Sequence, residues 1–176
     1  GTFTFSYSVS DGTSTVTADA DILITSANPI VGTSSADTLS GTSDADYIQG
    51  LEGNDNIYAY NGNDHITGGT GDDSLRGYAG DDTFYFSAGD GNDTIHESSG
   101  NDTIVFDNTI NVSDILYVRG GSSDYDLIIN NTSTNETITI DNWFYSSSPQ
   151  IIESIQFDDG TVHDQAFVTA AVAQQT

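Results

Sequence analysis

Residues 50–85 read GLEGNDNIY AYNGNDHIT GGTGDDSLR GYAGDDTFY, four consecutive segments of nine residues that share one pattern. The register extends over residues 32–105 and is interrupted only by a two-residue insertion, Phe86 and Ser87. The eight segments begin at Gly32, Gly41, Gly50, Ala59, Gly68, Gly77, Ala88 and Glu97. Self-similarity at a fixed period indicates a repeat architecture, in which each unit packs on its neighbours.

Three positions of the repeat are each restricted to one kind of residue, and each position forms a column when the segments are aligned. Position six is aspartate in all eight segments: Asp37, Asp46, Asp55, Asp64, Asp73, Asp82, Asp93 and Asp102. Position eight is large and apolar: Leu39, Ile48, Ile57, Ile66, Leu75, Phe84, Ile95 and Ile104. Position four is glycine in the last six: Gly53, Gly62, Gly71, Gly80, Gly91 and Gly100. Three columns in one phase argue against a merely acidic, solvated surface as the reason for the aspartates.

The period predicts short parallel strands separated by tight turns. Alternation along a strand places position eight on one face and positions seven and nine on the other. A coil of two segments then forms two sheets, with the position-eight column as the apolar filling between them. Turns on one edge of this coil are eighteen residues apart in sequence and neighbours in space. We therefore expect two aspartate columns, one of Asp37, Asp55 and Asp73 and the other of Asp46, Asp64 and Asp82.

The turns have the composition of a calcium site. Strands lie about 4.8 Å apart, so stacked carboxylates repel one another unless a cation lies between them. Carboxylates together with the carbonyls of glycine turns suit Ca²⁺ better than Zn²⁺ or Mg²⁺. The expected ligands are the eight position-six aspartates, with further oxygens from position five (Asn54, Asn63, Asp72 and Asp81) and from Gly50, Gly53, Gly62, Gly68, Gly69, Gly71, Gly77 and Gly80.

The repeats resemble the nonapeptide G-G-x-G-x-D-x-U-x of repeats-in-toxin (RTX, haemolysin-type) proteins. The segment GGTGDDSLR, which begins at Gly68, fits every specified position. The resemblance implies a parallel β-roll with several Ca²⁺ ions in its turns, unfolded in the cytosol and folded after type I secretion. Ser35 and Asp44 replace the glycine of position four in the first two repeats, so Asp37 and Asp46 are expected to be weaker ligands. The two-residue insertion separates Asp93 and Asp102 from the earlier repeats, so Asp55, Asp64, Asp73 and Asp82 are the strongest ligand candidates.

The flanking segments differ from the repeats in texture. Residues 1–30 alternate as two strands around a turn at Asp11-Gly12 and resemble the closing strands of an Ig-like or cadherin-like adhesin repeat. Residues 107–176 contain short β-rich runs, which we interpret as a small antiparallel β cap. Asp164 is a candidate N-cap of a short terminal helix. This cap resembles the segment that follows such rolls, and Trp143 is expected in its core.

Composition narrows the class of function. The formal charge is −25, with 27 acidic and 2 basic side chains, which argues against nucleic acid and against membrane insertion. There is no cysteine for a disulfide or a thiolate site. No G-x-S-x-G or H-E-x-x-H motif occurs, so we expect no enzyme activity. His65 and His96 are interpreted as surface residues and not as metal ligands or bases.

The leading hypothesis is a calcium-binding structural and secretion module from a large extracellular adhesin of a Gram-negative bacterium. Its partners would be calcium ions, the type I secretion machinery and, through the full-length protein, a host or abiotic surface. Two alternatives stay open. The chain could be the non-catalytic tail of a secreted lipase or protease. It could also bind sugar, peptide or ice through outward threonines such as Thr38 and Thr83.

Overall fold

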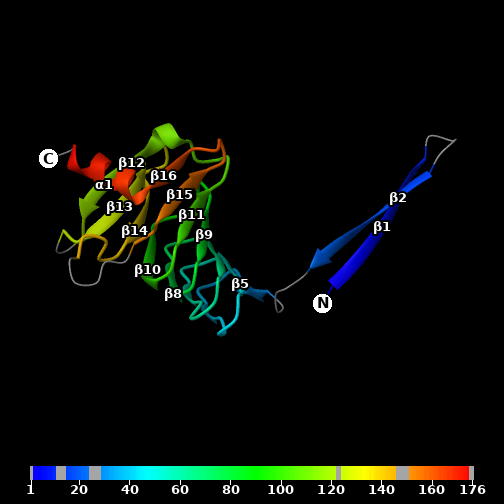
Figure 1. Ribbon diagram of the computed structural model, residues 1–176. Helices are drawn as coiled ribbons and strands as arrows, with labels where there is room; N and C mark the ends of the chain where they lie inside the picture. The colour runs from blue at the N-terminus through cyan, green and yellow to red at the C-terminus, as the bar shows by residue number, and fades with distance from the viewer. Residues whose placement is uncertain (1, 11–14, 24–28, 122–123, 146–150, 175–176) are drawn as a thin grey trace.

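The protein is described here by a computed structural model, in which residues 2–10, 15–23, 29–121, 124–145 and 151–174 are defined (Figure 1). The first two stretches form a hairpin. Strand β1 (Thr2–Ser10) pairs antiparallel with β2 (Thr15–Leu23). The hairpin expected from the alternation is therefore present in the backbone. Its predicted turn at Asp11-Gly12 lies outside the described residues.

The repeat region forms a roll of two parallel sheets. The strands of the first sheet are β3 (Ile30–Val31), β5 (Tyr47–Glu52), β7 (His65–Thr70), β9 (Thr83–Phe86) and β11 (Thr103–Phe106). Those of the second are β4 (Thr38–Ser40), β6 (Asn56–Tyr58), β8 (Ser74–Ala79) and β10 (Asp93–Ser99). Successive strands alternate between the sheets, and every pairing among these strands is parallel. The predicted parallel β-roll is confirmed.

The strand register has the step that the repeat predicts. Ile48 pairs with Ile66, eighteen residues on. After the insertion the step becomes twenty, and Leu75 pairs with Ile95. The two extra residues are thus absorbed without a change of sheet. Phe86, which ends β9, is buried in the core beside Phe106.

The position-eight column fills the space between the sheets. Seven of its eight side chains are at most 1 % exposed: Ile48, Ile57, Ile66, Leu75, Phe84, Ile95 and Ile104. Leu39, in the first repeat, is only partly buried. Burial of a side chain of this size contributes about 1.5–3 kcal/mol, which the ordering entropy of nine residues offsets. The apolar column therefore sets the strand register, but the turns must contribute further stabilising free energy.

The C-terminal segment extends both sheets of the roll. Strands β12 (Ile115–Gly120), β13 (Asp126–Asn131) and β14 (Glu136–Ile140) form an antiparallel meander, and β14 then pairs in parallel with β10. Strand β15 (Ser154–Phe157) pairs in parallel with β11, and β16 (Val162–Asp164) pairs antiparallel with β15. The expected antiparallel strands are present. They are continuous with the roll because its last two strands offer open edges for pairing.

A short helix completes the cap. Helix α1 (Gln165–Ala173) starts after Asp164, whose side chain accepts a hydrogen bond from the amide of Phe167, as the sequence predicts. Val168 and Val172 are buried. Trp143 is 4 % exposed and belongs to the core, as expected. In the described part of the chain, no helix has the length and apolar character needed to cross a membrane.

Truncation of the apolar column should destabilise the roll. Leu75 is fully buried between the sheets, so Leu75→Ala leaves a cavity and is expected to cost about 2–5 kcal/mol in the free energy of unfolding. Leu116 is 41 % exposed, and Leu116→Ala is the matched control, with an expected change within about 0.5 kcal/mol. Urea denaturation in saturating calcium measures both. Equal costs would contradict the assignment of the core.

Candidate metal centre

The position-six aspartates form two ladders, one on each edge of the roll. Along each edge, the backbone amide of one aspartate donates a hydrogen bond to Oδ1 of the next aspartate in the ladder. On the first edge these pairs are Asp37–Asp55 (2.7 Å), Asp55–Asp73 (2.7 Å) and Asp73–Asp93 (2.9 Å). On the second they are Asp46–Asp64 (2.8 Å), Asp64–Asp82 (2.9 Å) and Asp82–Asp102 (2.9 Å). The insertion therefore leaves both ladders continuous to Asp93 and Asp102.

The second carboxylate oxygen distinguishes four of these residues. Oδ2 is buried and has no hydrogen-bond partner among the described residues in Asp55, Asp64, Asp73 and Asp82. A buried charged oxygen without a partner is costly unless a cation or an unseen donor compensates it. At position one, Gly50, Gly68 and Gly77 give this oxygen room, because a Cβ there would collide with it. These are the four aspartates that the sequence marks as the strongest ligand candidates.

The first two turns are built differently. Oδ2 of Asp37 accepts hydrogen bonds from the amide (2.6 Å) and the hydroxyl (2.8 Å) of Thr33. Thr42 binds Asp46 in the same way, at 2.6 and 3.0 Å. Threonine at position two thus donates hydrogen bonds to the Oδ2 atom that has no partner in the third to sixth turns. The sequence ranked these two turns lower because of position four, and the threonine contacts give a second, independent reason.

Backbone conformation separates the two kinds of turn. Position four has a positive φ wherever it is glycine, for example 135° at Gly80, where a Cβ would also collide with the carbonyl of Gly62. Position two is left-handed as well in the third to sixth turns, with φ values of 83° at Leu51, 78° at Tyr60, 98° at Gly69 and 72° at Tyr78. Non-glycine residues adopt this conformation only at a cost. The sequence did not predict it for Leu51, Tyr60 or Tyr78.

Position five makes a second, outer ladder. Oδ1 of Asn54 accepts from the amide of Asp72 at 3.1 Å, and Oδ1 of Asn63 accepts from that of Asp81 at 3.0 Å. Beyond the insertion the step is 20 residues, and Oδ1 of Asp72 and of Asp81 accepts from the backbone amide of Asn92 and of Asn101 respectively. All four position-five side chains expected as auxiliary ligands are exposed and have one oxygen engaged in turn stacking. Their role as ligands stays a prediction.

The cap ends the second-edge ladder with a glutamate. Oε2 of Glu153 accepts from the amide of Asp102 at 2.7 Å, as the next aspartate of the column would. Glu97, at position one of the eighth repeat, is 4 % exposed, and one of its oxygens lies within 4.8 Å of oxygens of Asp82 and Asp102. Sequence reasoning missed both glutamates. The replacement of the usual small residue of position one by Glu97 was the available signal.

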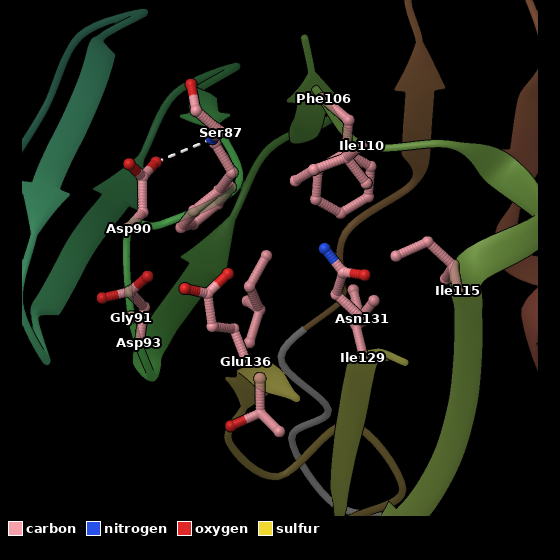
Figure 2. Close-up of a pocket in the computed structure, with 13 residues that line it drawn as sticks. Ser87, Asp90, Gly91, Asp93, Phe106, Ile110, Ile115, Ile129, Asn131 and Glu136 are labelled. Carbon is pink, nitrogen blue, oxygen red and sulfur yellow. Dashed lines mark hydrogen bonds between the residues drawn. The ribbon is translucent and has the colours of Figure 1, made fainter. Parts of the chain in front are cut away.

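A second acidic cluster lies where the first edge meets the cap. Figure 2 shows Asp90, Asp93 and Glu136 around a cavity whose other side carries Asn131 among apolar side chains. Asp90 accepts from the amide of Ser87 at 2.7 Å, and Glu136 from that of Gly89 at 3.0 Å. The cavity volume of about 20 Å³ suits a single water and excludes an organic ligand.

The stacked carboxylates are electrostatically strained in the absence of a cation. Desolvation by burial, followed by repulsion from neighbouring carboxylates, raises the pKa values of five of them: Asp64 and Asp73 to about 6, Asp102 to about 7, Asp93 to about 8 and Glu97 to about 9. Backbone amide hydrogen bonds lower these pKa values in part. The folded chain therefore holds protons at neutral pH that the unfolded chain would release.

These residues fit a calcium ion. The uncompensated Oδ2 atoms are hard, anionic oxygens, and they stand in turns whose glycines allow carbonyl groups to approach. The described cluster of Asp82, Glu97 and Asp102 offers carboxylate oxygens alone, without nitrogen or sulfur donors. A calcium ion bound there would neutralise repulsion that otherwise opposes the parallel stacking.

The three histidines have structural partners. His65 stacks between Tyr47 and Tyr85 on the outer face of the first sheet, and its Nδ1 lies 2.8 Å from the Tyr85 hydroxyl. His96 lies 2.8 Å from the carboxylate of Asp141. His163 is buried against the Tyr117 hydroxyl. Burial lowers the pKa of each of the three imidazoles.

Comparison with known proteins agrees with this geometry. The family model of the RTX calcium-binding nonapeptide repeat matches residues 31–66, 58–91 and 85–104. The haemolysin-type calcium binding protein related domain matches residues 126–166. The fold is similar to the solution structure of the AlgE6R3 subunit from the Azotobacter vinelandii mannuronan C5-epimerase, with a TM-score of 0.54 and 23 % identity over 69 % of this chain and 78 % of that chain. No curated protein matches the chain.

The fold and the two aspartate ladders thus define a calcium-binding parallel β-roll with a C-terminal cap. Residues 31–104 of this chain are RTX calcium-binding nonapeptide repeats, and they are followed by a haemolysin-type calcium-binding related domain.

The two kinds of turn should differ in their contribution to calcium binding. Asp46 and Asp64 are adjacent in one ladder and are 2 % and 0 % exposed, but only Asp46 has its Oδ2 bound to threonine. Asp64→Asn should raise the calcium concentration at the folding midpoint at least about tenfold, since it removes an uncompensated ligand charge. Asp46→Asn should have a clearly smaller effect. Circular dichroism during calcium titration compares them, and equal shifts would contradict the distinction.

The raised pKa values predict opposite pH effects with and without calcium. The unfolded carboxyls titrate near pH 4, so between about pH 4 and 9 the calcium-free folded chain binds more protons than the unfolded chain. Without calcium, the strand signal in circular dichroism should therefore increase as the pH is lowered from about 9 to about 5. In saturating calcium the urea midpoint of unfolding should instead fall over the same range, because protons compete with the ion. A urea midpoint that rises as the pH is lowered in saturating calcium would contradict a metal role for these carboxylates.

Proposed function

We propose that this chain is a structural and secretion module that folds on calcium outside the cell. The observation that carries the proposal is the set of four stacked, buried Oδ2 atoms in Asp55, Asp64, Asp73 and Asp82 without partners in the described structure. Without cations the roll must hold these carboxylates at strand spacing against their own repulsion. With calcium the repulsion becomes attraction, so the ion acts as a folding ligand.

Composition and family support an extracellular setting. A net charge of −25 destabilises a compact state unless cations are abundant, and calcium is abundant outside cells and scarce in the cytosol. A chain that stays unfolded until it meets calcium suits export through a narrow type I secretion channel. The N-terminal hairpin β1–β2, with its likeness to adhesin repeats, favours placement next to the Ig-like part of a large adhesin.

A secreted enzyme is the second candidate for the whole protein. The neighbour of similar fold is a subunit of a mannuronan epimerase, so such a roll accompanies catalysis in that protein. In the present chain, the buried carboxylates are ordered as ladders, and the histidines are engaged by tyrosines or by Asp141. We therefore assign the roll a non-catalytic role in either setting. An Ig-like or a catalytic domain elsewhere in the protein would decide between the two.

Calcium-driven folding is directly testable. The chain is stripped of divalent ions and followed by circular dichroism while calcium is added from micromolar to about 10 mM, which includes the dissociation constants of roughly 0.1–1 mM that extracellular modules have. The strand signal should appear cooperatively with calcium and disappear with chelator. Magnesium at equal concentration is the control and should be much less effective, because it requires a rigid octahedral site. The same strand signal in chelator as in calcium would refute the proposal.

A further inference from the structure

Glu97 is the exceptional residue of the position-one column. The other seven residues of that column are glycine or alanine, and they are Gly32, Gly41, Gly50, Ala59, Gly68, Gly77 and Ala88. Glu97 lies in β10, is 4 % exposed and points into the roll. Its Oε1 reaches the place where a Cβ of Gly77 would stand, beside Oδ2 of Asp82. The side chain therefore enters the space between the sixth and eighth turns of the second edge.

Three carboxylates converge in this space. Asp82, Glu97 and Asp102 each offer one oxygen, all within 4.8 Å of one another, and their exposed fractions are 1 %, 4 % and 1 %. Oδ2 of Asp82 has no hydrogen-bond partner in the described structure. The charges that act most strongly on Glu97 are the other two carboxylates, and both disfavour its ionised form. A standard pair of stacked turns contributes two carboxylates, both from position six. This pair contributes a third, from Glu97 at position one.

The cap holds one of the three in place. Glu153, which precedes β15, accepts from the Asp102 amide at 2.7 Å and so occupies the position of the next aspartate in the ladder. Glu97, Asp102 and Glu153 line a hollow at this end of the roll, together with Ile151 of the cap. The three-carboxylate cluster is thus located at the junction of the repeats with the cap.

We propose that Asp82, Glu97 and Asp102 form a distinct calcium site at this junction, in which the side chain of Glu97 is an additional ligand. The inference rests on the proposed calcium-binding function of the roll and goes beyond it. Three carboxylates give the site more negative charge than the two of a standard pair of turns. Because the number of charged ligands tunes calcium affinity, this site binds more tightly than the other sites on the second edge. Glu153 acts as a positioning residue through the amide of Asp102.

A neutral Glu97 is the competing explanation. A protonated carboxyl could hydrogen-bond to Asp82 or Asp102 and would stabilise the cluster without an ion. Glu97→Gln discriminates between the two, because glutamine keeps the size and the hydrogen-bonding capacity of the protonated acid and removes the ligand charge. Glu52→Gln is the matched control, since Glu52 is an exposed glutamate in the third turn and lies outside the cluster.

The experiment measures calcium binding to the whole 176-residue chain by isothermal titration calorimetry, with ion counts from native mass spectrometry. We expect Glu97→Gln to weaken one tight binding step at least about tenfold and to remove one ion at low calcium, while Glu52→Gln matches the wild type. Equal affinities and counts in the two variants would overturn the proposal. If the wild-type chain binds no calcium at all, the proposed function itself fails, which is a separate result.

A second variant covers a failure of Glu97→Gln to fold. Glu97→Gly restores the glycine that five other repeats carry at position one, so it is compatible with the roll. It should fold in excess calcium and lose the same tight step. A Glu97→Gly protein with the tight step intact would show that Glu97 is not a ligand.

Discussion

The structure depends on the spacing that a parallel sheet imposes on its turns. Strand pairing fixes successive turns about 4.8 Å apart, and the eighteen-residue step places an aspartate in each of them. Two unit charges at that distance repel by roughly 3 kcal/mol at an effective dielectric constant of 20. The apolar column between the sheets cannot absorb several such costs. The stacked aspartates therefore require a cation or a hydrogen-bond donor that compensates their negative charge.

The two carboxylate oxygens of these aspartates have different roles. From Asp55 onward, Oδ1 accepts a hydrogen bond from a backbone amide of the neighbouring turn and so connects turns in one direction along the edge. Oδ2 accepts hydrogen bonds from a threonine within its own turn at Asp37 and Asp46, whereas at Asp55 and Asp64 it is buried without a partner among the described residues. The backbone follows this division, because position two is left-handed at Leu51 and Tyr60. A local hydrogen bond and the proposed calcium contact are thus alternatives at one atom.

The regular part of this architecture could be predicted from the sequence. The period gave the two sheets, the step of eighteen, the buried column from Ile48 to Ile104 and the two aspartate edges, because each follows from strand geometry alone. The N-cap at Asp164 was likewise a local signal. Glu97 and Glu153 were not predicted, because their positions depend on how the cap meets the roll. The parallel pairing of β14 with β10 joins residues that are 45 positions apart, such as Asp93 and Ile138, and no local pattern encodes it.

The alternation of strands between two sheets also constrains how the length of such a chain can vary. Removal of one nonapeptide would move every later strand to the opposite sheet and every later aspartate to the opposite edge, so the cap would meet the wrong strands. Removal or duplication of two nonapeptides preserves both assignments. A two-residue insertion at the end of a strand, as at Phe86 and Ser87, is tolerated because both ladders resume on the same edges. The roll can therefore differ in length by whole coils of two nonapeptides, while the cap and its Glu153 contact with the last turn stay unchanged.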